Sequence, residues 1–97
     1  MADETCFDTL IHAPNRLQIC AMLATAAEIE FKVLRDHLDV SDSVLSKHIK
    51  VLQEAGYVVL IKRSDFGRQR SWLSLSSGGR KAYTGHVNEL KRIVGEV

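Results

Sequence analysis

The sequence predicts a mainly α-helical fold with a small β-hairpin, and two features carry this prediction. The first is a helix-like stretch over residues 41–56, in which Leu45, Ile49 and Leu52 recur at spacings of four and three residues. Such spacing places the three side chains on one buried face of a helix. The second is a pair of apolar or alternating runs, residues 57–63 and 71–75, on either side of the polar segment SDFGRQR. β-Branched and aromatic residues favour strands, so these runs predict a hairpin, or wing, over about residues 57–75.

The stretch over residues 41–56 has a signal at each end. Ser41 stands where an N-cap side chain accepts a hydrogen bond from a free backbone N–H group. Gly56 stands where helices commonly end with one residue in the left-handed region. A shorter amphipathic segment ends near Asp39, and its apolar residues are Phe31, Leu34, Leu38 and Val40. The two segments are only a few residues apart, which predicts a helix-turn-helix pair.

The remaining elements can be placed coarsely. Pro14 fits the first turn of a helix over about residues 15–24, which would turn Leu17, Cys20 and Leu23 or Ala24 inward. We expect a short helix before Pro14, a short third strand over residues 28–30, and a last helix within about residues 79–95, after Gly78 and Gly79. The expectation is one domain over residues 1–97: three core helices, a wing and extra terminal helices.

The side of residues 41–56 that faces away from the apolar stripe is predicted to contact DNA. It carries small or cationic side chains: Ser43, Val44, Ser46, Lys47 and Lys50. Small side chains allow close approach to a groove, while lysine can meet phosphate. A solvated, serine-rich face would be an equal alternative for an isolated helix. The following hairpin favours DNA, because a helix-turn-helix followed by a hairpin can place its second helix in the major groove and its tip on phosphate or in the minor groove.

The distribution of charge agrees with this interpretation. The net charge is only +1, but residues 1–40 have a balance of −4 and residues 41–81 a balance of +5. The cationic excess therefore lies on the predicted DNA-facing helix, the hairpin and the start of the last helix. In the hairpin, Arg68, Gln69 and Arg70 are the predicted DNA contacts.

Five stretches match a known pattern: HAPNRL at residues 12–17, LSKHI at 45–49, LQEAGYV at 52–58, GRQRSW at 67–72 and LSSGGR at 75–80. Through them the chain resembles winged-helix transcriptional regulators of the MarR/ArsR type, and most closely their compact single-domain branch. The resemblance covers roughly residues 12–95. It implies a winged helix-turn-helix that binds a promoter and represses transcription by blocking polymerase. Relatives usually carry Asp-x-Arg at the wing tip, and Asp65-Phe66-Gly67 departs from that motif.

An apolar seam at spacings of four, three and four residues runs along the predicted last helix: Tyr83, Val87, Leu90 and Val94. This narrow seam is typical of a coiled-coil contact. It would either pack on the domain's own core or join two copies, and we predict a homodimer because three helices and a sheet already complete the core. The N-terminal apolar residues would cover the flank of the interface: Phe7, Leu10 and Ile11. Two copies would bind a palindromic operator.

Other functions receive less support from the sequence. The four histidines are dispersed, without the spacing of a catalytic nucleophile and its base, so we expect neither an enzyme nor a cofactor. His86 and Glu89 loosely resemble the interfacial metal site of some ArsR-like sensors. However, the partnering Asp-x-His pattern and a Cys-x-Cys within residues 28–39 are both missing. A winged helix used as a protein-interaction module remains an alternative, although protein interfaces deplete lysine.

Composition predicts a cytoplasmic protein whose partners are double-stranded DNA and a second copy of itself. Cys6 and Cys20 form no disulfide framework, and no apolar run approaches the roughly 18 residues of a membrane helix. The acidic N-terminus is unlike a secretory signal. A small-molecule inducer is left open.

Overall fold

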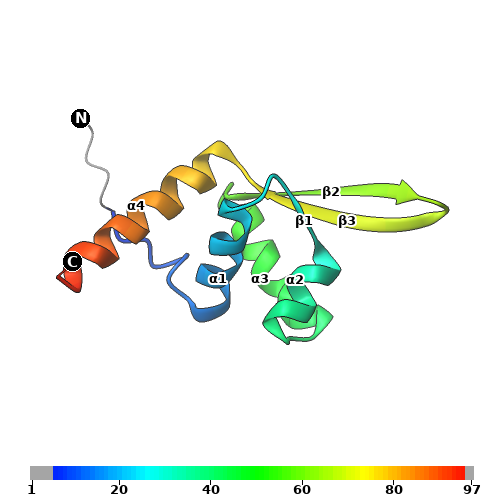
Figure 1. The fold of residues 1–97 in the computed structure, drawn as a ribbon. Coiled ribbons are helices and arrows are strands. Elements are labelled where there is room, and N and C mark those ends of the chain that lie inside the picture. The colour runs from blue at the N-terminus through cyan, green and yellow to red at the C-terminus, as the bar shows by residue number, and fades with distance from the viewer. Residues whose placement is uncertain (1–5, 96–97) are drawn as a thin grey trace.

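The computed structural model describes residues 6–95 and arranges them as a winged helix-turn-helix. The elements are α1 (Pro14–Ala24), β1 (Ile29–Glu30), α2 (Phe31–Leu38), α3 (Asp42–Glu54), β2 (Val58–Asp65), β3 (Arg68–Leu75) and α4 (Ser77–Ile93). Helices α1 to α3 lie together at the centre, the hairpin extends to one side and α4 extends to the other (Figure 1). The molecule is therefore elongated, 49 Å by 27 Å by 24 Å. The predicted fold class is confirmed.

The core lies between helices α1 to α3 and the base of the sheet. The predicted stripe of α3 is buried in it, with Leu45 and Leu52 fully buried and Ile49 2 % exposed. The other apolar residues of the core are Ile11, Ile19, Cys20, Leu23, Leu34, Val58 and Leu73. Burial raises the pKa of the Cys20 thiol to about 11, and the negative charge of Asp8 adds to the shift. Cys20 is thus a neutral core residue, as its position on α1 predicts.

The sheet has the strand order β1-β3-β2, and both pairings are antiparallel. The expected third strand is confirmed as β1. The wing differs from the prediction at its tip, because β2 and β3 pair continuously from Val58↔Leu75 to Asp65↔Arg68. Only Phe66 and Gly67 form the turn, with φ of +52° and +77°. Two residues with positive φ match the twist of the flanking strands, so a two-residue turn suffices where a seven-residue tip was expected.

The N-terminal segment is not the short helix that the sequence predicted; residues 9–12 form turns. The Asp8 carboxylate accepts hydrogen bonds from the N–H groups of Leu10 and Ile11, at 3.0 and 3.1 Å. Its other oxygen accepts a hydrogen bond from the Tyr57 hydroxyl at 2.6 Å, which raises the pKa of Tyr57 to about 12. Ile11 enters the core and is fully buried, so its assignment to a dimer interface was wrong.

His86 joins this segment to α4. It is fully buried, and its Nδ1 accepts a hydrogen bond from the Asp8 N–H at 2.9 Å. Its Nε2 lies 3.0 Å from His12 Nδ1, and the Phe7 ring lies against both imidazoles. Burial lowers the pKa of His86. Its long-range partners, Asp8 and His12, place His86 inside the fold.

Helix α4 begins two residues earlier than the predicted range, because Ser76 is its N-cap. The Ser76 hydroxyl accepts a hydrogen bond from the Gly79 N–H at 2.9 Å and donates one to the Gly56 carbonyl at 2.6 Å. The Ser76 N–H donates to the Tyr57 carbonyl at 2.9 Å. Gly79 lies so close to this turn that an added Cβ would stand 2.0 Å from the Tyr57 oxygen. The absence of a side chain at residue 79 therefore allows α4 to start against the base of the hairpin.

No helix within residues 6–95 combines the length and the apolar character needed to cross a membrane.

Gly79→Ala should destabilise the protein by about 2 kcal/mol or more, because the new Cβ overlaps backbone atoms that cannot rotate away. Gly78→Ala is the matched control, since its Cβ would meet nothing closer than 3.8 Å. In the control, alanine's helix propensity should raise stability by roughly 0.5–1 kcal/mol. Urea unfolding of both variants measures the difference, and equal stabilities would contradict this close approach.

Candidate nucleic-acid interface

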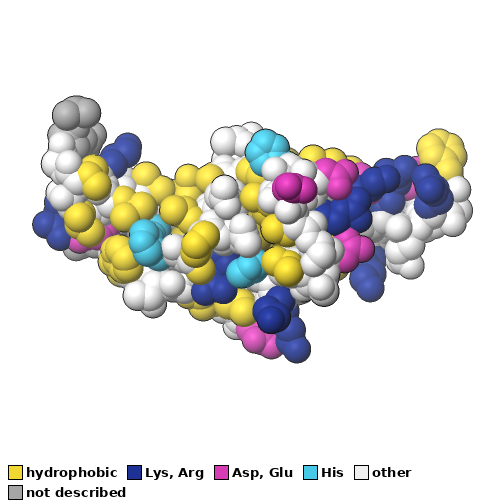
Figure 2. All heavy atoms as spheres, turned by 90° about the horizontal axis from the view of Figure 1, so that it is seen from below, with side chains coloured by type: hydrophobic (Ala, Val, Ile, Leu, Met, Phe, Trp, Pro, Cys, Tyr) yellow, Lys and Arg dark blue, Asp and Glu magenta, His cyan; other side chains and the backbone are white. Residues whose placement is uncertain are grey.

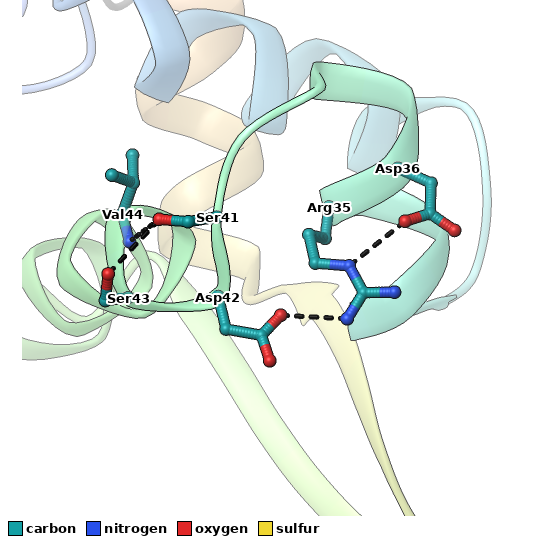
Figure 3. Close-up of polar contacts among 6 residues, drawn as sticks. All are labelled: Arg35, Asp36, Ser41, Asp42, Ser43 and Val44. Atoms are coloured by element: carbon teal, nitrogen blue, oxygen red, sulfur yellow. Dashed lines mark hydrogen bonds and ion pairs between the residues drawn. The ribbon is translucent and has the colours of Figure 1, made fainter.

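The turn between α2 and α3 fixes the orientation of the helix predicted to enter DNA. Asp39 ends α2 in the left-handed region, with φ of +56°, and its N–H donates to the Arg35 and Asp36 carbonyls. Ser41 then caps α3 by accepting a hydrogen bond from the Val44 N–H at 3.2 Å (Figure 3). The cap predicted from the sequence is confirmed. Gly56, with φ of +79°, ends the same helix as predicted.

Arg35 links the two helices electrostatically. Its guanidinium lies 2.8 Å from Asp42 at the start of α3 and 3.0 Å from Asp36 on its own helix (Figure 3). The hydrogen bond to Asp42, and to a smaller extent that to Asp36, raises the pKa of Arg35. The pair offsets the carboxylate charge of Asp42, which would otherwise repel phosphate beside the exposed face of α3.

The predicted contact residues of α3 lie on its exposed side: Ser43, Val44, Ser46, Lys47 and Lys50. Ser43, Ser46, Lys47 and Lys50 follow at three- and four-residue spacing, so they form one strip opposite the buried stripe. Val44 is 39 % exposed beside this strip. Among the described residues, neither lysine has an ion-pair partner, so both ammonium groups are free to meet phosphate.

His48 does not belong to this exposed strip. Its ring nitrogens lie 3.4 Å from the Asn15 amide nitrogen and 3.4 Å from an Arg16 guanidinium nitrogen, both on α1. Burial lowers the pKa of His48, and the positive charges of Arg16 and Lys47 lower it further. His48 therefore packs between α3 and α1.

The outer face of the hairpin carries arginines that are already paired. Arg63 lies 2.5 Å from Glu28 and above the Trp72 ring, at 4.9 Å from its centroid. Arg70 lies 3.2 Å from Glu30. The acidic partners come from the segment that leads into α2, so these pairs tie the wing to the helical body. Arg70, predicted as a DNA contact, is therefore also a brace of the wing.

Two other cations of the hairpin are exposed and without an ion pair among residues 6–95: Lys62 and Arg68. Alternation along the strands places Lys62 and Gln69 on the face that continues into the core, on the side of α2 and α3. Arg68 lies on the opposite face, next to the tip. Lys62 was missing from the predicted site, although strict alternation from the core residues Val58 and Leu60 would have placed it there.

Cationic side chains line the hairpin, and apolar side chains are prominent around α4 and the N-terminal segment. Figure 2 shows Lys and Arg side chains along the hairpin, while hydrophobic side chains predominate towards the end formed by α4 and the N-terminal segment. Within residues 6–95, no three His, Cys, Asp or Glu side chains lie together as a metal site would require. The cations of α3 and the hairpin are suited to contact with a polyanion.

The two predicted arginines should behave differently when replaced. Arg70→Ala leaves Glu30, whose side chain is only 16 % exposed, without its partner, and should lower stability by about 1 kcal/mol. Arg68→Ala should leave the thermal midpoint nearly unchanged, weaken DNA binding and reduce its salt slope by about one unit. Calorimetry and binding titrations at several salt concentrations separate the two effects. If Arg68→Ala and Arg70→Ala lowered stability equally, the assignment of a structural role to Arg70 alone would be wrong.

Comparison with known proteins agrees with this geometry. A family model described as a winged helix DNA-binding domain matches residues 15–94. The chain is 30 % identical over 78 residues to the uncharacterized protein MJ0432 of Methanocaldococcus jannaschii. The aligned residues make up 80 % of this chain and 85 % of the relative.

Solved structures show the same fold. A transcriptional regulator homologue from Pyrococcus horikoshii OT3 superposes with a TM-score of 0.84 at 24 % identity, over 89 % of this chain and 85 % of the other. HlyU from Vibrio cholerae N16961 superposes with a TM-score of 0.63 at 28 % identity, over 90 % of this chain and 86 % of HlyU. The resemblance to regulators of the MarR/ArsR type is thus confirmed: the chain belongs to the winged-helix DNA-binding family of transcriptional regulators, which is not a family of enzymes.

Proposed function

We propose that the protein is a homodimeric repressor that recognises a palindromic operator in double-stranded DNA. The observation that carries the proposal is the exposed strip of α3, in which serines and two lysines lie together on a capped helix. Neither lysine has an ion-pair partner within residues 6–95. In this arrangement Ser43, Val44 and Ser46 meet base edges, and Lys47 and Lys50 meet phosphate.

The wing extends the same surface. Lys62 is exposed on the face of the hairpin towards α2 and α3. Arg68 and Gln69 are exposed nearer the tip than the Arg63↔Arg70 pair of the ladder, so the three side chains can follow the DNA backbone away from α3. The ion pairs of Arg63 and Arg70 restrict the motion of the hairpin, which lowers the entropic cost of binding. Both cysteines are free thiols, which is in keeping with a reducing, cytoplasmic location.

Selection of bound sequences from a random duplex pool tests DNA recognition. Ser46→Ala or Val44→Ala should change the preferred base at one half-site position. Lys50→Ala should weaken all sequences alike and reduce the salt slope by about one unit. Lys91→Ala, which removes an exposed cation at the far end of α4, is the control and should change neither. Binding without sequence preference, or nearly independent of salt, would favour the protein-interaction module instead.

The proposed dimer contact lies on the outer part of α4. Val87 and Leu90 are half-buried without belonging to the core cluster, and Val94 is 74 % exposed. Phe7, 42 % exposed, continues this apolar surface through its contact with the buried His86. Tyr83 and Leu10 pack partly on the chain's own core and so contribute at its edge. A two-fold axis here would set two α3 helices about 10 base pairs apart on a palindrome.

Leu90→Glu should convert the dimer to a monomer and abolish tight operator binding, because burying a leucine is worth about 1.5–3 kcal/mol and a symmetric interface contains it twice. Lys91→Glu places the same carboxylate one residue further on, at an exposed position, and should leave the dimer intact. Sedimentation and far-UV circular dichroism measure mass and helix content. A wild-type monomer at micromolar concentration that still binds its operator tightly would overturn the dimer.

A further inference from the structure

Phe66, at the tip of the wing, has no structural role in the free protein. Its side chain is 97 % exposed, the highest value among the large hydrophobic residues of the described chain. A phenyl ring left in water contributes nothing to folding, whereas burial elsewhere would be favourable. The ring therefore gains contacts only if something outside the described chain covers it.

The turn itself does not account for a phenylalanine. Residue 66 has φ of +52°, in the left-handed region, and is followed by Gly67 at +77°. Two-residue turns of this kind favour Asn-Gly or Asp-Gly, because small polar residues adopt positive φ more readily than bulky ones. Phe66 thus occupies a position where backbone geometry favours asparagine, at the most protruding point of the hairpin.

The surroundings of the ring indicate the kind of partner. Arg68 follows the turn, exposed and without an ion pair among residues 6–95, and Lys62 lies further back on the hairpin. The one acidic neighbour, Asp65, has its carboxylate 3.6 Å from Arg70. Hydrophobic atoms stand at the end of the hairpin with Lys and Arg side chains behind them (Figure 2). An apolar point backed by cations fits a partner whose apolar interior lies between two lines of negative charge.

Duplex DNA presents that combination in its minor groove, which has phosphates on both rims and stacked bases at its floor. The groove is about 6 Å wide, so it admits one side chain and not a whole two-stranded ribbon. We propose that Phe66 is a wedge: the wing inserts its ring into the minor groove beside the major groove that holds α3, where it partly unstacks one base step, as apolar side chains do in minor-groove binders. This inference rests on the proposed DNA-binding function and adds a residue that reads the flexibility of the flanking sequence.

The test uses the full-length protein and the operator obtained by selection, with 2-aminopurine placed in turn at each position of the flanking segment. When the wild type binds, unstacking by the Phe66 ring should raise the fluorescence of 2-aminopurine at one base step. Phe66→Asn should abolish this rise and lower affinity roughly tenfold or more. The salt slope should stay unchanged, because no phosphate contact is lost. Phe66→Leu, which keeps an apolar wedge, should retain part of both effects.

Phe66→Asn also controls for folding, since asparagine suits this turn and its thermal midpoint should not fall below that of the wild type. Operator binding by Phe66→Asn with wild-type affinity, or wild-type binding without a fluorescence rise at any step, would overturn the wedge while leaving the DNA-binding function intact. Failure of the wild type to select any duplex would overturn both. Phe66-dependent sedimentation with phosphatidylserine vesicles, together with unaltered operator binding, would replace the wedge by a membrane contact.

Discussion

The approach of Gly79 to the Tyr57 carbonyl is the contact on which the geometry of this molecule depends. From this point the hairpin leaves in one direction and α4 in the other, and the Ser76 hydroxyl joins the end of α3 to the start of α4. The wing and the proposed dimer helix therefore share one rigid base. In a dimer joined through α4, the spacing of the two α3 helices would follow from the angle set here. A side chain at residue 79 would disturb recognition as well as folding.

The distribution of ion pairs explains how a chain of net charge +1 can present a basic surface. Arg35, Arg63 and Arg70 each neutralise carboxylates near the DNA-facing side, and they hold the α2–α3 turn and the wing in place by doing so. Among residues 6–95, the exposed cations without an ion pair on this side include Lys47, Lys50, Lys62 and Arg68. A pair with both partners exposed, such as Arg63 and Glu28, adds little stability by itself. The larger effect of these pairs is on the electrostatic potential of this surface. The arginines neutralise carboxylates whose negative charge would otherwise repel phosphate.

Most features governed by neighbours along the chain could be predicted from the sequence, whereas the N-terminal segment and His86 depend on distant partners and could not. The stripe, the Ser41 cap and the Gly56 terminus of α3 depend on local periodicity and capping, and all three are confirmed. The N-terminal turns depend on the Asp8 carboxylate, which bonds Tyr57 forty-nine residues away. The burial of His86 depends on the same segment. The seven-residue tip was wrong because a phenylalanine at positive φ is rare and gives no turn signal.

The elongated shape assigns two tasks to opposite ends of one small fold. Apolar surface on α4 and Phe7 lies at one end, and the exposed cations of the hairpin and Phe66 lie at the other, along a 49 Å axis. If the α4 ends meet at a two-fold axis, each wing must point away from it. The wings would then contact DNA outside the two half-sites, where the bases are not read by α3. Sequence preference in those flanks would arise from how easily the minor groove deforms, and the length of the hairpin would set how far the operator extends.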